Sequence, residues 1–287
     1  MTGETFPVIL IFLQQKFIHL KLQKGFIMEI MDFFFHGMSN SQLIILVISA
    51  ILIGINKTGM PGLGLLPVVM LALWFDSRIS PGLQLVMLAV TDIFAVIYYR
   101  HKANWPLLFR LIPSALCGIA VGWAILRFGI DRTPHASYVM NLTIGIIVIA
   151  LCIFSVVKDI IWKDKDTVPK HWAFAVACGL FAGITTQLAN AAGPIMAIYL
   201  LAMRFDKKEY MGTAAWYFMI LNWIKLPIFW SEGRITKASF LADMGMIPFL
   251  LLGAVLGIVL LKKLPQKVFE KAVLFLSGLA AIKLLIP

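Results

Sequence analysis

Eight long apolar runs limit the fold of this sequence more than any other feature. A helix of roughly 20 residues is long enough to cross the hydrocarbon core of a bilayer. Of the 287 residues, 61% are hydrophobic and 14% are charged, which leaves more apolar surface than a water-soluble core can bury. The sequence therefore predicts an all-α, polytopic integral membrane protein with about eight transmembrane elements. The runs lie near residues 42–75, 82–99, 106–128, 137–157, 171–203, 212–230, 240–261 and 268–286.

The runs fall into two groups with similar local sequences. Residues 71–76 (LALWFD) reappear as residues 201–206 (LAMRFD), and residues 118–122 (GIAVG) reappear as residues 253–257 (GAVLG). Internal duplication is common among transporters, so we expect two homologous repeats. The paired glycines are typical of close helix packing and do not indicate a site.

The N-terminal segment differs from the rest of the chain. It mixes apolar residues with Gln, Lys and His, which favours an amphipathic helix in the membrane interface over a span or a signal peptide. Met28 or Met31 is an alternative start, in which case we expect the leader to be dispensable. The expected parts are a leader (1–40), a first repeat (41–157), a connecting loop (158–170) and a second repeat (171–287).

A polar, glycine-rich segment interrupts the first helix of each repeat, at residues 54–64 and 183–194. Irregular backbone survives at membrane depth only where protein or a water-filled cavity satisfies its polar groups, so such breaks indicate a substrate site. Each broken helix either crosses the membrane or folds into a re-entrant hairpin. That choice decides whether the repeats run parallel or inverted, and the sequence leaves it open.

The composition of the two breaks favours an anionic solute. Unpaired N–H groups at the start of a half-helix carry the positive end of its dipole. Lys57 adds a full positive charge, the glycines let a ligand approach the backbone, and neither break contains a carboxylate. The alternative for Lys57 is a side chain that snorkels to the interface. The candidate substrate-binding residues are Asn56, Lys57, Thr58, Gly59, Gly62, Gly64, Thr185, Thr186, Gln187, Asn190, Gly193, Asn222 and Lys225.

Two further charged residues lie inside apolar runs. Lys225 shares a helix face with Asn222, and it either serves the site or snorkels toward the end of its helix. Asp92 lies opposite Asn222 in the repeat register, and it either accepts a coupling proton or pairs with a neighbouring group. The aspartates at the ends of runs, Asp76, Asp206 and Asp243, are expected to be solvated or to cap helices.

Charge and cysteine content argue against other classes of protein. The net charge of +11 falls mainly in short connections, which favours lipid headgroups over nucleic acid as the partner. Cys117, Cys152 and Cys178 have no ligand-type spacing, so we expect no metal site, and no cofactor is indicated. Without a Walker lysine motif, a proton gradient or membrane potential is the expected energy source. A homodimer is compatible with the sequence.

Three segments resemble the sulfite exporter TauE/SafE family of bacterial membrane permeases. They are residues 54–64 with Pro67, residues 192–194 (AGP) and residues 222–227 (NWIKLP), and the resemblance runs from about residue 41 to the end. It implies transport of sulfite, a sulfonate such as sulfoacetate, or another small organic or sulfur-containing anion across the bacterial inner membrane.

The expected protein is a secondary transporter, not an enzyme, with alternating access at a midplane site between the repeats. One alternative is a membrane-embedded enzyme acting on a lipid or phosphate, but neither break holds a His, Cys or carboxylate. Another is a cation or metal permease, which would need oxygen rings or His/Met clusters at depth.

Overall fold

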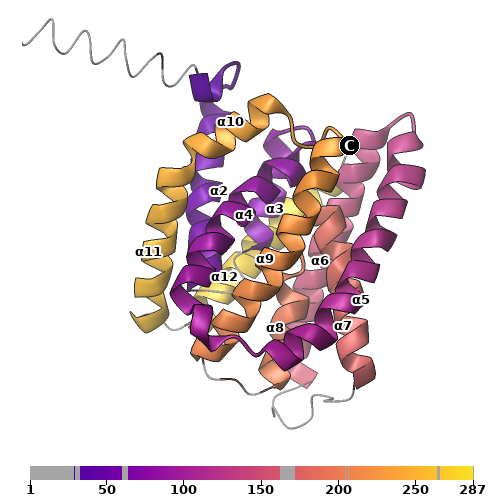
Figure 1. Cartoon of the computed structure of the whole chain (residues 1–287). Coiled ribbons are helices and arrows are strands. Elements are labelled where there is room, and N and C mark those ends of the chain that lie inside the picture. Colours follow the sequence, from indigo (N-terminus) through magenta and orange to yellow (C-terminus); the bar gives the residue numbers. More distant parts are fainter. Residues whose placement is uncertain are drawn as a thin grey trace, which may run out of the picture.

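The computed structural model describes residues 29, 33–59, 64–161, 172–203, 205, 207–263 and 266–286, and these residues form helices and turns without a strand (Figure 1). The all-α prediction is confirmed. The predicted leader falls almost entirely outside the described residues, as do most of the connecting loop and Gly62. The main helices are α2 (Asn40–Thr58), α3 (Leu65–Trp74), α4 (Ser80–Tyr99), α5 (Trp105–Ala124), α6 (Ala136–Ile161), α7 (Trp172–Ala189), α8 (Gly193–Ala202), α9 (Lys207–Ser231), α10 (Lys237–Gly245), α11 (Ile247–Lys263) and α12 (Gln266–Leu285). Short helical turns are η1 (Arg100–Lys102), η2 (Ile125–Gly129) and η3 (Ile130–Arg132).

Each of the eight predicted runs is helical, but not every one is a candidate span. Within the described residues, five helices are long and apolar enough to cross a membrane, and a sixth counts if α10 and α11, which meet at a 48° bend, form one span. Helix α9 is long enough but carries Asn222 and Lys225, which lower its hydropathy. The structure therefore supports five or six spans where the sequence predicted about eight.

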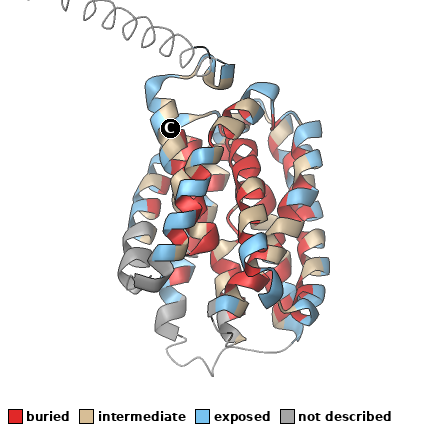
Figure 2. Cartoon of the chain, turned by 60° about the vertical axis from the view of Figure 1, so that its left-hand side comes forward, coloured by how far each residue is buried: buried red, intermediate tan, exposed pale blue. Residues whose placement is uncertain are grey.

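The outer surface of the helices is apolar. Buried residues line the interior, while exposed residues face outward (Figure 2). Large side chains on that surface include Phe109, exposed over 70% of its area, Ile97 at 62% and Phe181 at 60%. Exposed apolar area of this extent suits lipid rather than water. Together with the candidate spans, it makes this a multi-pass membrane protein.

Helices α2 and α3 fold back on each other, and α7 and α8 do the same. The Gln42 amide at the start of α2 donates a hydrogen bond of 3.2 Å to the Trp74 carbonyl at the end of α3. The rings of Phe174, early in α7, and Tyr199, late in α8, lie 6.0 Å apart. Such contacts between distant ends require hairpins. In each hairpin the two helices therefore meet at the ends that lie opposite to the turn.

The two hairpins open toward opposite ends of the molecule. Helices α4 and α9 run antiparallel, because Gly82 of α4 touches the Arg234 carbonyl that follows α9, while Gly212 of α9 touches Lys102 just beyond α4. Helix α3 leads into the start of α4, and α8 leads into the start of α9. The first hairpin therefore opens at one end and the second at the other.

Glycines allow two pairs of helices to pack backbone to backbone. A Cβ on Gly54 of α2 would collide with the Leu250 carbonyl of α11, and one on Gly253 would collide with the Ile51 carbonyl. The pair α5 and α7 packs in the same way, since a Cβ on Gly118 would meet the Leu180 carbonyl and one on Gly183 the Ala115 carbonyl. The prediction that the Gly118–Gly122 and Gly253–Gly257 pairs serve helix packing is confirmed, whereas Gly54 and Gly183, predicted to belong to the breaks, also serve packing.

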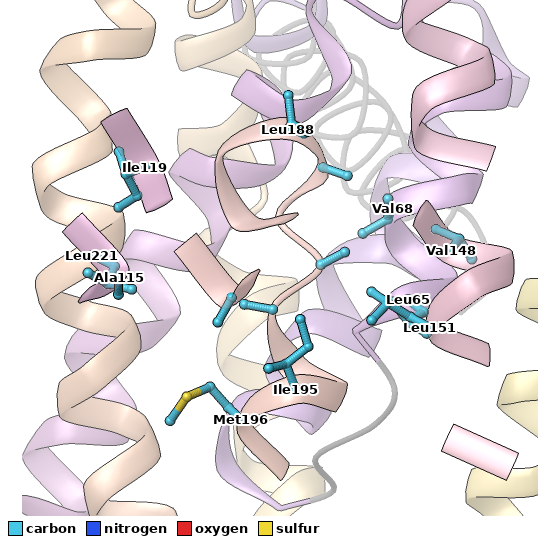
Figure 3. Packing of buried hydrophobic residues seen from close by; sticks show 14 of the residues in the cluster. Leu65, Val68, Ala115, Ile119, Val148, Leu151, Leu188, Ile195, Met196 and Leu221 are labelled. Atoms are coloured by element: carbon cyan, nitrogen blue, oxygen red, sulfur yellow. The ribbon is translucent and has the colours of Figure 1, made fainter. Parts of the chain in front are cut away.

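An apolar cluster holds the hairpin turns in place. It joins residues of α3, α5, α6, α7, α8 and α9. Figure 3 shows Leu65 and Val68 of α3 close to Val148 and Leu151 of α6, with Ile195 and Met196 of α8 below. Because both half-helices are anchored on this cluster, the polar groups at their starts are held in fixed positions.

Candidate functional site

A cavity of about 50 Å³ lies where the two hairpin turns meet α4 and α9. A water molecule needs roughly 10–15 Å³ of such space, so the cavity has room for a few waters or one small anion. Its apolar lining includes Leu65, Leu88, Met196 and Phe218. The polar side chains and glycines that line it are Asn56, Lys57, Gly64, Gln84, Thr186, Asn190, Gly193, Tyr210 and Asn222.

A buried ion pair and a hydrogen bond to it join three helices at the cavity. The Lys57 ammonium of α2 lies 2.6 Å from Oδ1 of Asp92 on α4, and the two side chains are 6% and 0% exposed. The other oxygen of Asp92 accepts a hydrogen bond of 2.7 Å from the Asn222 amide of α9. The Lys57 ammonium also lies 4.3 Å from the centre of the Phe218 ring, a favourable cation–π distance. Both oxygens of Asp92 are therefore engaged.

Lys225 is a second buried ammonium group, and its hydrogen-bond partners are uncharged. It is 0% exposed and donates to the Thr186 carbonyl at 2.7 Å, the Thr186 hydroxyl at 3.0 Å and the Asn190 amide oxygen at 2.6 Å. Among the described residues, no carboxylate forms an ion pair with it. Lys225 does not itself line the cavity, but both of its partners do. The snorkelling alternatives for Lys57 and Lys225 are therefore wrong.

Asn190 holds the second hairpin turn in shape. Its backbone has φ +52°, in the left-handed region that asparagine tolerates better than most residues, and this ends α7. Its amide nitrogen donates to the Pro81 carbonyl at the start of α4, at 2.7 Å. One side chain thus ties the turn to α4 and, through its oxygen, to Lys225.

The starts of both short helices face the cavity. Gly64 and Leu65 begin α3, Gly193 and Pro194 begin α8, and all four line the cavity. The first N–H groups of a helix lack partners within it and carry partial positive charge. A Cβ added at Gly193 would meet no atom within 4 Å, so that position faces open space. The two helix N-termini therefore give the cavity a partial positive lining beside the Lys57–Asp92 pair.

The predicted site residues that the structure describes fall into three groups: those that line the cavity, those behind the lining, and those that do not reach it. Lys225 and Asp92 lie behind the lining and contact it. Four others do not reach the cavity: Thr58, Gly59, Thr185 and Gln187. Since successive helix residues point about 100° apart, only one face of each hairpin helix can line the cavity. The predicted residues that line the cavity are Asn56, Lys57, Gly64, Thr186, Asn190, Gly193 and Asn222.

The four remaining residues serve packing in this structure. The Thr58 hydroxyl lies 2.7 Å from the Ala254 carbonyl of α11, and Gly59 abuts the backbone of Gly257. The Thr185 hydroxyl bonds to the Phe181 carbonyl within its own helix, at 2.9 Å. Gln187 is fully buried beside Gly122 of α5, away from the cavity.

Sequence reasoning missed the contribution of α4 to the lining. Gln84 is 2% exposed and lies eight residues before Asp92, with Leu88 midway. Residues four apart share a helix face, so Gln84 could have been predicted from its position on the same face as Asp92. Phe218 of α9 could have been found in the same way, four residues before Asn222.

Of the three aspartates at the ends of runs, one is placed as predicted, one is not, and one is not described. Asp76 is exposed, as expected, and accepts a hydrogen bond from the Arg78 backbone at 2.8 Å. Asp243, expected to be solvated or capping, is 0% exposed. The reason is that α10 packs against α4, which covers that end of the helix. Asp206 lies outside the described residues.

Comparison with known proteins identifies the family. No curated protein and no solved structure matches the chain. The family model described as sulfite exporter TauE/SafE matches residues 45–284, which include both hairpins, α4 and α9. That match covers most of the sequence. The chain therefore belongs to the sulfite exporter TauE/SafE family, a family of membrane transporters.

Proposed function

We propose that this protein moves a small oxyanion, sulfite or an organosulfonate, across the bacterial inner membrane and binds it in the cavity between the hairpins. Membership of the TauE/SafE family implies a membrane transporter of the sulfite or sulfonate type. The finer points, namely the solute, its site and the way it crosses, are the proposal.

The observation that carries the proposal is an imbalance of buried charge. Two ammonium groups, Lys57 and Lys225, and one carboxylate, Asp92, lie at the cavity or directly behind it, with exposures of 8% or less. A buried charge without a counter-charge is costly and is usually retained for a task. A bound monovalent anion would restore neutrality. The cavity therefore suits an anion better than a cation.

The lining also offers donors where an oxyanion needs them. The starts of α3 and α8 present backbone N–H groups, and Asn56 supplies a side-chain amide. The volume of about 50 Å³ suits a solute of a few heavy atoms, such as sulfite, better than a large organic anion.

The arrangement of the hairpins supports alternating access. They open toward opposite ends of the molecule and meet at the cavity, as expected for repeats of inverted topology. In this proposal one repeat rocks against the other around a fixed site, and the proton gradient supplies the energy. The duplication itself stays a prediction from the sequence.

Ligand-linked stabilisation of the purified protein tests the site. We expect sulfite or a sulfonate to raise the thermal midpoint of the wild type. Lys225→Met should abolish this shift, because it removes the uncompensated charge. Lys237→Met is the matched control, since Lys237 is an exposed lysine on α10, and it should keep the shift. An equal shift in Lys225→Met would refute the assignment of Lys225.

A further inference from the structure

A carboxylate outside the substrate cavity has no partner. Asp243 lies near the end of α10, is 0% exposed, and neither of its oxygens has a hydrogen-bond partner among the described residues. No residue of α10 lines the cavity. Asp243 is therefore a buried ionisable group that the proposed solute site does not use.

The surroundings of Asp243 are apolar. Its neighbours in sequence, Ala242 and Met246, pack in a cluster with Leu83 and Met87 of α4. Beside it, Gly245 lies against the Phe35 ring.

Met244 of α10 packs on a cluster that includes Phe229 of α9. The charged groups of that region have other partners: Lys225 donates to Thr186 and Asn190, and Arg234 donates to Glu232 and Asp131.

The other elements packed around α10 carry no ionisable side chain along the stretch that faces it. There is none in residues 80–91 of α4, in residues 247–261 of α11 or in residues 40–56 of α2. His36, on the turn before α2, is exposed. Asp92 and Lys57 lie further along α4 and α2 and are paired with each other.

We propose that Asp243 is a proton-binding site that couples transport to the proton gradient, an inference that rests on the proposed transport function. An ionised carboxylate without a partner is too costly in an apolar interior, whereas the neutral acid is tolerated. The carboxyl group gives its proton to water when it is exposed to one side of the membrane. It takes up a proton from water when it is exposed to the other side. A metal ion such as Na⁺ would need several further oxygen ligands, whereas the residues packed beside Asp243 in the chain are apolar.

A chain of contacts links Asp243 to the solute site. Asp243 lies four residues before the start of α11, which is bent by 48° from α10. Helix α11 packs on α2 through Gly253 and Gly257, and the Thr58 hydroxyl of α2 lies 2.7 Å from the Ala254 carbonyl. Thr58 is the residue after Lys57. Opening of the bend to water would therefore move the helix that carries Lys57.

Asp92 is less suited to carry the proton. Its two oxygens are engaged by Lys57 and Asn222, so its charge is already balanced. The prediction from the sequence that Asp92 couples transport thus has a rival on a different helix, and the two can be separated by experiment.

Infrared spectroscopy of the full-length purified protein tests proton binding directly. We expect the wild type at neutral pH to show the C=O stretching band of a protonated carboxyl group. Asp243→Asn should remove this band, Asp243→Glu should shift it, and Asp92→Asn and Asp76→Asn should leave it unchanged. Absence of the band in the wild type, or its persistence in Asp243→Asn, would overturn the proposal.

Flux measurements in proteoliposomes test coupling. Asp243→Asn should keep sulfite–sulfite exchange, because asparagine mimics the neutral acid, but should lose accumulation driven by a pH gradient. Retained pH-driven accumulation would overturn the proposal. If the wild type shows the carboxyl band but exchanges neither sulfite nor sulfonates, the failure belongs to the proposed solute and not to Asp243.

Discussion

At the scale of single residues, the site depends on how three buried charges are matched. Lys57 has a carboxylate partner 2.6 Å away, while Lys225 relies on the neutral oxygens of Thr186 and Asn190. Lys57 is therefore balanced without solute, and Lys225 supplies the excess charge. This division could not be read from the sequence, in which the two lysines look alike.

The pairing of Lys57 with Asp92 predicts a compensating double substitution. Lys57→Met or Asp92→Asn alone should each destabilise the protein, because removing one partner of a buried ion pair typically costs about 3–5 kcal/mol. The double substitution should recover most of the lost stability, since it leaves no unpaired charge. Denaturation of all four proteins in the same detergent measures the coupling. Additive effects of the two single substitutions would contradict a direct pair.

At the scale of helices, glycine has two distinct uses. Gly183 lets α7 touch α5, and a Cβ there would collide with the Ala115 carbonyl. Gly193 begins α8 at the cavity, and a Cβ there would meet nothing within 4 Å. The same residue type thus serves packing at one position and leaves open space at the cavity at the other.

This difference predicts opposite results for the same substitution. Gly183→Val should lower expression and stability, because overpacking of a tight contact costs about 1–3 kcal/mol or more. Gly193→Val should fold and insert normally but lose sulfite binding, since the side chain would occupy the cavity. Gly278→Val is the control, because its Cβ also meets nothing within 4 Å and it lies on α12, away from the cavity. Normal sulfite binding by Gly193→Val would show that the solute does not approach α8.

At the scale of the whole molecule, a second charged cluster joins several segments at one end of the helices. The Arg234 guanidinium, after α9, donates to both oxygens of Asp131 in η3, at 2.9 and 2.7 Å. It also donates to Glu232 at 3.1 Å and to the Arg78 carbonyl before α4, at 3.3 Å. The cluster joins the two halves of the chain at the end where the first hairpin opens.

Glu232 makes the stability contributed by this charged cluster sensitive to pH. Burial raises the pKa of Glu232 above its ordinary value of 4.5, and the neighbouring Arg234 only partly offsets this effect. The folded state therefore holds the proton more tightly than the unfolded state, and stability should fall as pH rises from 4.5 through the raised pKa. Glu232→Gln should flatten that part of the profile of thermal midpoint against pH. An identical slope in wild type and variant would contradict this role of Glu232.

Much of the architecture was predictable from local sequence. The apolar runs predicted the helices, and the two polar breaks contain several of the residues that line the cavity. Asn56, Lys57, Thr186 and Asn190 all line the cavity. These features depend on composition and periodicity, which the sequence shows directly.

The remaining features depend on contacts between distant segments. Gln187 belongs to a predicted break, yet its side chain packs against Gly122 of α5. The packing of α7 on α5 decides which of its residues face α5 and which face the cavity. Asp243 lies at the end of an apolar run yet is buried, because α10 packs on α4. Neither fact has a local signal in the sequence.

The most direct test of the account is solute exchange in proteoliposomes that contain only this protein. Vesicles loaded with sulfite, methanesulfonate or sulfoacetate would be diluted into the labelled solute, and chemically unchanged label inside would be measured. We expect saturable exchange of at least one of these anions by the wild type and by Lys237→Met, and none by Lys225→Met. Wild-type exchange no faster than in protein-free vesicles for all three, or full exchange by Lys225→Met, would contradict this expectation.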